Sequence, residues 1–270
     1  MQVSRFVRFS LLAFLIIGIP ALSFSGVVIS VAIAPPALPV YVQPACPGDG
    51  YIWTPGYWAY GPDGYYWVPG TWVLAPEPGF LWTPGYWGWG GSAYIWHAGY
   101  WGPHVGFYGG IDYGFGYTGV GYSGGYWRGR EFYYNRSVNN VRITNVHIYN
   151  KTVINNYTVN RVSYNGGRGG TNMRPTGQQV RWEHERHMEA TGPQMQHEHA
   201  ARENREFLAS SNHGRPPVAA VARPGDFHGH DAVPARGGRD IRSEQRMNGN
   251  VPHPQGSARM ERPAPRQNNM

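Results

Sequence analysis

Histidine side chains that could bind a metal ion are concentrated in the C-terminal part of the chain. Eight of the eleven histidines lie beyond residue 178, and three pairs are close in sequence: His184 with His187, His197 with His199, and His228 with His230. Imidazole is a common ligand for zinc, copper and nickel. Because no cysteine accompanies these pairs and the surrounding sequence is polar, they predict at most loose metal binding and no firm metal site.

Other side chains that could do chemistry are not arranged for catalysis. The sequence has no phosphate-binding loop, no Cys-His pair in a suitable context and no convincing pair of carboxylates. Asp63 and Glu77 both lie in expected turns, where Asp is ordinary turn chemistry and Glu is solvated. We therefore expect no enzyme activity, no catalytic residue and no cofactor.

Four copies of the pattern Trp-x-x-Gly-x-Trp dominate the middle of the chain. They occupy residues 53–58, 67–72, 82–87 and 96–101, and their first tryptophans are 14, 15 and 14 residues apart. A period near 14 suits one strand and one tight turn, so we expect antiparallel hairpins without helices between them. The tryptophans of this ladder, as a core or as an aromatic binding face, are Trp53, Trp58, Trp67, Trp72, Trp82, Trp87, Trp96 and Trp101.

Turn residues set the expected register of three successive hairpins. A turn at Pro62-Asp63 pairs Trp58 with Trp67 and Trp53 with Trp72. A loop centred on Glu77 pairs Trp72 with Trp82 and Trp67 with Trp87. A turn at Gly91-Ser92 pairs Trp87 with Trp96, Trp82 with Trp101, and Trp89 with Tyr94. Together these pairs predict a meander with continuous tryptophan ladders.

The two tryptophans of one repeat are an odd number of residues apart, so a regular strand would place them on opposite faces. A bulge at Pro-Gly would return both to one face, and we favour it. The alternative is a type II turn at each Thr-Pro-Gly-Tyr, with the two tryptophans facing across a miniature hairpin.

These repeats resemble those of the bacterial YXWGXW (or WXXGXW) repeat proteins, envelope proteins of poorly defined function. Glycine- and aromatic-rich flanks at residues 102–110 and 124–129 extend the resemblance. His97-Ala98 in the fourth repeat and Thr71 in the second depart from the pattern. The resemblance implies export and a tryptophan-rich fold, and it brings no catalytic residues.

Composition predicts a mainly β protein: an antiparallel meander of Trp-rich hairpins, a second Asn/Val-rich β segment, short marginal helices and a disordered C-terminal tail. The expected segments are a signal peptide (1–25), an N-terminal strand and Pro-rich linker (26–50), the repeats (51–101), a Gly/aromatic-rich irregular loop (102–132), the Asn/Val/Thr-rich segment (133–165), a helical segment broken at Thr191-Gly192-Pro193 (178–209), and a disordered basic tail (210–270).

The N-terminus predicts export. Arg5 and Arg8 precede an apolar run over residues 9–19, which Pro20 and small residues follow, as in a secretory signal peptide. The expected location is the periplasm or outer surface of a bacterium, with an uncleaved anchor over residues 9–34 as the alternative. Expected partners are cell-wall polysaccharide, an anionic envelope polymer or a second copy through sheet edges, and no nucleic acid is expected.

Three functional hypotheses follow from these patterns. The first is a structural or interaction module in which the tryptophans form the core. The second is binding of peptidoglycan or another polysaccharide through an exposed aromatic face. The third is loose metal binding by the His-rich tail. The first two differ in one observable, because a binding face needs open tryptophans and a core needs buried ones.

Overall fold

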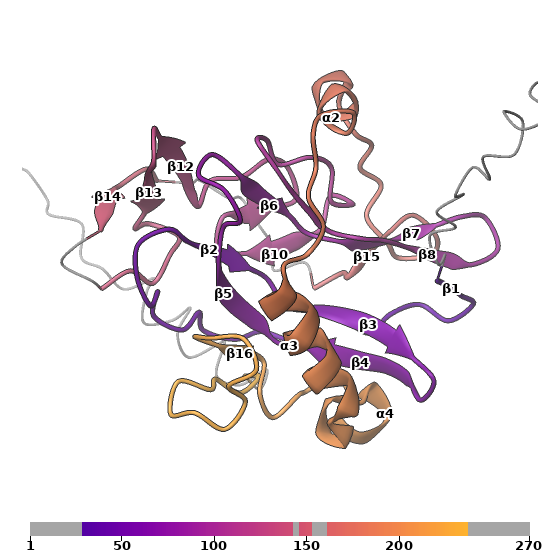
Figure 1. The fold of residues 1–270 in the computed structure, drawn as a ribbon. Helices are drawn as coiled ribbons and strands as arrows, with labels where there is room; N and C mark the ends of the chain where they lie inside the picture. Colours follow the sequence, from indigo (N-terminus) through magenta and orange to yellow (C-terminus); the bar gives the residue numbers. More distant parts are fainter. Residues whose placement is uncertain (1–28, 143–145, 153–160, 237–270) are drawn as a thin grey trace, which may run out of the picture.

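A computed structural model describes residues 29–142, 146–152 and 161–236. The fold is mainly β, with several antiparallel hairpins and a few short helices, so the predicted fold class is confirmed (Figure 1). The predicted signal peptide and residues 237–270 of the predicted tail lie outside the described residues. Among the helices of the described residues, none has the length and apolar character that a membrane crossing requires.

The first two repeats form one long hairpin, which we call the first module (residues 51–74). Its strands are β2 (Tyr51–Thr54), β3 (Tyr57–Gly61), β4 (Gly64–Val68) and β5 (Gly70–Leu74). The inner strands β3 and β4 pair Trp58 with Trp67, and the outer strands β2 and β5 pair Trp53 with Trp72. Both predicted pairs are confirmed.

The third and fourth repeats form a second long hairpin, the second module (residues 81–102). Its strands are β6 (Leu81–Thr83), β7 (Tyr86–Trp89), β8 (Tyr94–His97) and β9 (Tyr100–Gly102). Trp87 faces Trp96 across β7 and β8, while Trp82 faces Trp101 across β6 and β9. The predicted register of this hairpin, including Trp89 opposite Tyr94, is also confirmed.

The middle hairpin does not form, so the predicted meander is wrong at this point. Trp72 pairs with Trp53 rather than Trp82, and Trp67 pairs with Trp58 rather than Trp87. The outer strands of each module hydrogen-bond to each other, and the second edge of β5 is taken by β16 (Ala220–Val221), which runs parallel to it. Because both edges of β5 are occupied, the loop around Glu77 connects the two modules without forming a hairpin between them.

Each repeat is interrupted instead of bulging, at its Pro-Gly step in the first three repeats and at Ala98-Gly99 in the fourth. β2 ends at Thr54 and β3 begins at Tyr57, and the inner and outer strand pairs belong to separate sheets. Neither predicted alternative, the bulge or the miniature hairpin, describes this geometry. Proline cannot donate to a ladder, and here it ends a strand so that the long hairpin changes direction.

The segment before the repeats supports them as an extended chain. Its strand is only β1 (Ser30–Val31), antiparallel to β8. The indole nitrogen of Trp58 donates to the Ala37 carbonyl at 3.1 Å, and that of Trp72 donates to the Pro44 carbonyl at 3.0 Å. The Pro-rich linker therefore supplies acceptors for buried indoles.

The glycine-rich stretch is more regular than the irregular loop we expected. It contains β10 (Asp112–Gly114), β11 (Tyr117–Thr118) and β12 (Gly125–Arg128), and β12 forms a hairpin with β13 (Glu131–Asn135). Buried rings such as Tyr108 and Tyr117 pack this region, as predicted. Glycines at positive φ, including Gly116 at 96°, make the tight turns that allow the strands to form.

The Asn/Val-rich segment provides two further short strands. β14 (His147–Tyr149) runs parallel to β13, and β15 (Tyr164–Asn165) runs parallel to β7. None of residues 136–142 lies in a strand. Asparagine side chains bond to nearby backbone there instead; Asn139 Nδ2, for example, donates to the Asn135 carbonyl at 3.2 Å. Residues 153–160 of this predicted segment lie outside the described residues.

The helical segment is ordered and packed more than its composition suggested. It contains α2 (Gly177–Trp182), α3 (Gly192–Glu203), the 3-10 turn η1 (Arg205–Phe207) and α4 (Ala209–Asn212). The predicted break at Thr191-Gly192-Pro193 is confirmed, because α3 begins there as a helix separate from α2, with the Thr191 N–H donating to Gln194 Oε1 at 2.9 Å. α3 lies across β4, and it buries His197 and Ala201 (Figure 1).

The prediction of a disordered tail is wrong for residues 210–236. Residues 210–236 are described, and Ala219, Ala220 and Val221 are fully buried where β16 joins β5. The Ala219 carbonyl also accepts the indole N–H of Trp67 at 3.0 Å. A short Val-Ala-Ala-Val stretch inside a polar region is therefore enough to fix this part of the chain to the first module.

Candidate functional site

The predicted tryptophan ladder lies in the core. Seven of its eight members are buried, with exposed fractions between 0% and 7%: Trp53, Trp58, Trp67, Trp72, Trp82, Trp87 and Trp101. Trp96 is half-buried. The paired rings contact each other at centroid distances of 5.2 to 5.3 Å. The ladder thus offers no continuous open aromatic face.

The glycine of each repeat explains the spacing of the pattern. Gly85 and Gly99 cross so closely that a Cβ on either one would lie 2.8 Å from the backbone nitrogen of the other. The first tryptophan of each repeat covers the glycine of its partner repeat: a Cβ on Gly99 would lie 2.5 Å from Cζ2 of Trp82, and one on Gly85 would lie 2.6 Å from Cζ2 of Trp96. Only glycine fits beneath these rings.

The first module repeats the same arrangement. A Cβ on Gly70 would lie 2.6 Å from Cζ2 of Trp53 and 2.9 Å from the nitrogen of Gly56, while Trp67 covers Gly56. Trp-x-x-Gly-x-Trp is therefore a packing code between two repeats: the two Trp positions build the ladder, and the glycine admits the partner's ring.

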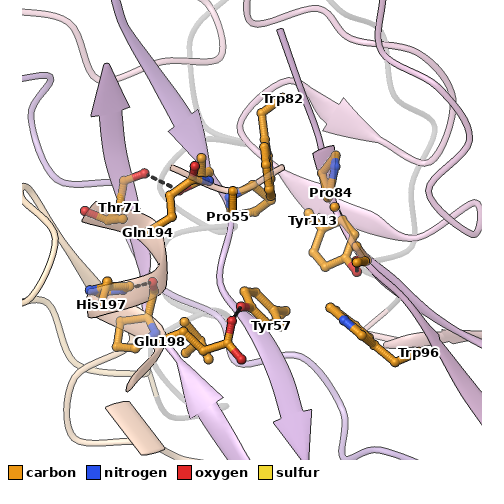
Figure 2. Close-up of a pocket in the computed structure, with 17 residues that line it drawn as sticks. Pro55, Tyr57, Thr71, Trp82, Pro84, Trp96, Tyr113, Gln194, His197 and Glu198 are labelled. Carbon is orange, nitrogen blue, oxygen red and sulfur yellow. Dashed lines mark hydrogen bonds between the residues drawn. The ribbon is translucent and has the colours of Figure 1, made fainter. Parts of the chain in front are cut away.

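A cavity of about 100 Å³ lies where all four repeats meet (Figure 2). Its wall contains the residue before the glycine of every repeat, namely Pro55, Pro69, Pro84 and Ala98. Four aromatic rings, those of Tyr57, Trp82, Trp96 and Tyr113, add to the wall, and Gln194, His197 and Glu198 of α3 close one side. Every repeat and the helical segment thus contribute to the central cavity.

The polar groups of α3 at the central cavity are already bonded. The N–H of Gly225 donates to Nδ1 of His197 at 2.8 Å, so Nε2 carries the proton and donates to the Pro69 carbonyl at 2.8 Å. Burial lowers the pKa of His197 to about 4, and the bond to Pro69 only partly opposes this. His197 is therefore neutral near pH 7 and joins α3, the second repeat and the chain near residue 225.

Glu198 is bonded in a similar way. Its two carboxylate oxygens accept hydrogen bonds from the Tyr57 hydroxyl at 2.8 Å and the Tyr66 hydroxyl at 3.3 Å. Burial, and next the charge of Glu198, raises the pKa of Tyr57 well above its usual value. Gln194 accepts from the Trp101 indole N–H at 2.8 Å. These side chains hold the fold together and leave no free base or activated nucleophile in the central cavity.

One buried hydroxyl in the cavity wall has no such partner. Thr71 is 2% exposed, and its Oγ1 makes no hydrogen bond with a described residue. A buried hydroxyl favours a polar neighbour. A small polar ligand in the central cavity would accordingly find a free hydrogen-bonding group at Thr71.

The histidines predicted as weak metal ligands are dispersed in the structure. His197 is buried and fully bonded, His199 contacts Glu203 at 3.6 Å, and His230 contacts Asp231 at 3.1 Å. His187 stacks on Tyr100, while His184 and His228 are exposed. Among the described residues, no three His, Cys, Asp or Glu side chains come together in a way that could hold a metal ion.

A Gly-x-Ser-x-Gly pattern at residues 121–125 escaped the sequence analysis. In hydrolases this pattern needs a strand before the serine and a helix after it. Here Ser123 lies in a loop before β12, and its hydroxyl donates to the Gly116 carbonyl at 3.3 Å. The serine therefore has a structural role in closing a glycine turn.

Sequence reasoning also missed the contribution of α3 to the central cavity. A signal for it exists: Gln194, His197 and Ala201 follow the i, i+3, i+7 spacing of one helix face, and His197 and Ala201 are buried. Two of the three are polar, so the stripe does not stand out as apolar. This face packs through hydrogen bonds to residues more than a hundred positions away in the chain, such as the bond from His197 to Pro69.

Comparison with known proteins agrees with the geometry. A family model described as the WXXGXW repeat matches in two copies, at residues 48–73 and 78–101. Each copy covers one long hairpin and therefore two Trp-x-x-Gly-x-Trp patterns, because the unit that folds is the pair of interlocked repeats. No curated protein and no solved structure matches the chain. As its sequence indicated, the chain contains WXXGXW repeats, at residues 48–73 and 78–101.

Proposed function

We propose that this is an exported, non-enzymatic protein of the bacterial envelope in which the WXXGXW repeats act as a structural scaffold. The single observation that supports the scaffold role is the burial of seven of the eight ladder tryptophans, each first tryptophan closing over its partner's glycine. A ladder built this way stabilises a fold and offers no continuous open face of rings to a ligand. The signal-like N-terminus supports export.

The absence of catalysis is part of the same proposal. In the central cavity, the two α3 side chains that could act as acid or base are already bonded, His197 to backbone groups and Glu198 to two tyrosine hydroxyls. A general base must be free to reach its substrate's proton. Neither the sugar alternative in its predicted form, with an open tryptophan face, nor the metal alternative receives comparable support.

Tryptophan fluorescence with acrylamide quenching tests the scaffold role. We expect blue-shifted emission that acrylamide quenches poorly, with no change when purified peptidoglycan is added, because the indoles are buried. Red-shifted emission that is readily quenched, and protected by the polymer, would contradict the proposal. Cell fractionation with the intact mass of the recovered protein tests export separately, and recovery of full-length chain from the cytoplasm would count against it.

A further inference from the structure

A second hollow, which we call the groove, lies beside the second module and does not involve the buried ladder. Its volume is about 460 Å³, and it shares only Pro84 and Ala98 with the central cavity. One wall comes from the module, with Tyr86, His97 and Tyr100, and the opposite wall comes from residues 173–187. Ligand pockets of small molecules typically span about 300 to 1,000 Å³.

Two flat aromatic stacks lie in the groove wall. The rings of Tyr86 and His97 are nearly parallel, with centroids 4.5 Å apart and an interplanar angle of 6°. Tyr100 and His187 stack with centroids 3.8 Å apart. His97 is exposed, whereas Tyr86, Tyr100 and His187 are half-buried. The groove therefore places one solvent-exposed ring, that of His97, beside half-buried tyrosine and histidine rings.

Two charged side chains of opposite sign complete the groove. Glu183 and Arg174 both line it, both are exposed, and neither forms an ion pair with another described residue. Burial, and to a smaller extent the charge of Glu183, raises the pKa of Tyr86 to about 12. Burial lowers the pKa of His97, and the charge of Glu183 opposes that change. Its carboxylate thus lies close to the aromatic wall and is free to accept hydrogen bonds.

The wall opposite the module is fixed in place by hydrogen bonds. The side chain of Asn165 donates to the carbonyls of Gly109 at 3.1 Å and Met173 at 2.9 Å. Met188 and Trp101 exchange two backbone hydrogen bonds, at 2.8 and 2.9 Å. A groove whose two walls are joined at both ends is preformed, so a ligand would lose little free energy in ordering it.

We propose that the groove binds a glycan made of uncharged pyranose rings. The apolar faces of sugar rings pack on planar aromatic side chains, and their hydroxyls bond to a carboxylate and a guanidinium at the rim. One negative and one positive side chain leave the groove without net charge, which favours an uncharged chain. The inference rests on the proposed envelope location only for the source of the glycan.

A peptide strand fits the groove less well. A peptide in an extended conformation gains affinity by adding to a free sheet edge. Of the strands beside the groove, β7 is flanked by β8 and β15, β8 by β1 and β7, and β9 by β6 and the Met188 bridge. Among the described residues, no open strand edge therefore remains at the groove.

Isothermal titration calorimetry of the full chain with soluble tetrasaccharides tests this proposal. The probes are β-1,4-linked N-acetylglucosamine and α-1,4-linked glucose tetramers, a tetramer of galacturonate as the charged counterpart, and an alanine-rich tetrapeptide. We expect an uncharged tetramer to bind. Glu183→Gln should weaken it about tenfold, because a hydroxyl bond to a charged acceptor is lost. Arg174→Gln should weaken it similarly.

Glu189→Gln and Arg168→Gln are the matched controls, since both residues are exposed and neither lines the groove. They should leave the affinity unchanged. The proposal is overturned if no uncharged tetramer binds, if the tetrapeptide or the galacturonate binds instead, or if Glu183→Gln and Arg174→Gln behave like their controls. The fluorescence and fractionation results do not depend on the groove, so its failure would leave the proposed scaffold role standing.

Discussion

The two modules share one geometry but differ in what covers them. In the first, the fully buried Trp67 donates its indole N–H to Ala219, and β16 occupies the edge of β5. In the second, the tryptophan equivalent to Trp67 is Trp96, which is half-buried. Its neighbour His97 is exposed beside the groove. The repeat therefore sets how the hairpin folds, and distant segments set whether it becomes core or surface.

Truncating the equivalent tryptophans should give the largest difference between the modules. Trp67→Ala should lower the free energy of unfolding by about 3 to 5 kcal/mol, since a buried indole and its bond to Ala219 are lost. Trp96→Ala should cost roughly half as much, because that ring is only half-buried. Urea denaturation measures both. If both variants lose the same free energy of unfolding, the segments that cover the modules do not make them different in stability.

A pH titration of stability should separate the histidines next to the two modules. The pKa of His197 is about 4 in the folded protein and 6.5 when unfolded, so the unfolded state binds the proton more readily. Its stabilising contribution is complete above about pH 6.5 and is lost as the pH falls toward 4, by roughly 3 kcal/mol in total. His197→Gln should flatten this part of the profile in denaturation experiments run from pH 7.5 to 4.

His97 provides the comparison for that titration. It is exposed, burial lowers its pKa, and the charge of Glu183 opposes the change. His97→Gln should therefore leave the pH profile closer to that of the unmodified chain. A flattening as large as that of His197→Gln would contradict the assignment of the acid-sensitive contact to α3.

Adding a methyl group at the glycine crossings should destabilise both modules alike. Gly70→Ala and Gly85→Ala each place a Cβ within 2.9 Å of a backbone nitrogen and against a tryptophan ring. We expect a loss of about 1 to 3 kcal/mol for each in urea denaturation. Gly192→Ala at the start of α3 is the control, because its added Cβ would meet no atom within 4 Å. If either crossing variant matches this control, its module does not depend on the close approach.

Removing the hydroxyl of Tyr57 should give the smallest of these stability changes. Tyr57 of the first module stacks on Trp96 of the second, with centroids 5.2 Å apart and an angle of 18°, and donates to Glu198. Tyr57→Phe keeps the ring and should cost about 1 kcal/mol in thermal or urea unfolding. Tyr60→Phe, whose hydroxyl makes no hydrogen bond with a described residue, should be near neutral. A null result at Tyr57 would show that its hydrogen bond to Glu198 of α3 adds no measurable stability.

Local patterns predicted the hairpins and their registers well. Pro62-Asp63 and Gly91-Ser92 are turn residues flanked by aromatics, and both turns form with the expected cross-strand pairs. The loop around Glu77 looks equally suitable in sequence, but its flanking tryptophans pair elsewhere. The failure has a physical reason: a strand has two edges, and the sequence near residue 77 does not reveal that β16, about 145 residues later, occupies one of them.

The candidate sites were less predictable than the hairpins. His197 and His187 were predicted as weak metal ligands. In the structure His197 is buried and bonds to the Pro69 carbonyl, and His187 stacks on Tyr100. The groove joins side chains from residues 86–107 to others from 165–187, and no periodicity in either segment indicates the other.

The tryptophan-paired hairpins could be predicted from local sequence, because the Trp-Gly spacing and the turn residues act within about twenty residues of chain. Three features depend instead on the packing of distant segments: which tryptophans are buried, the cavity lined by the four Pro/Ala-Gly steps, and the groove lined by Tyr86 and Tyr100. Burial is a property of all the segments that surround a side chain. Here those segments include residues 197–198 and 219–221, which bond to the first two repeats from more than a hundred residues away.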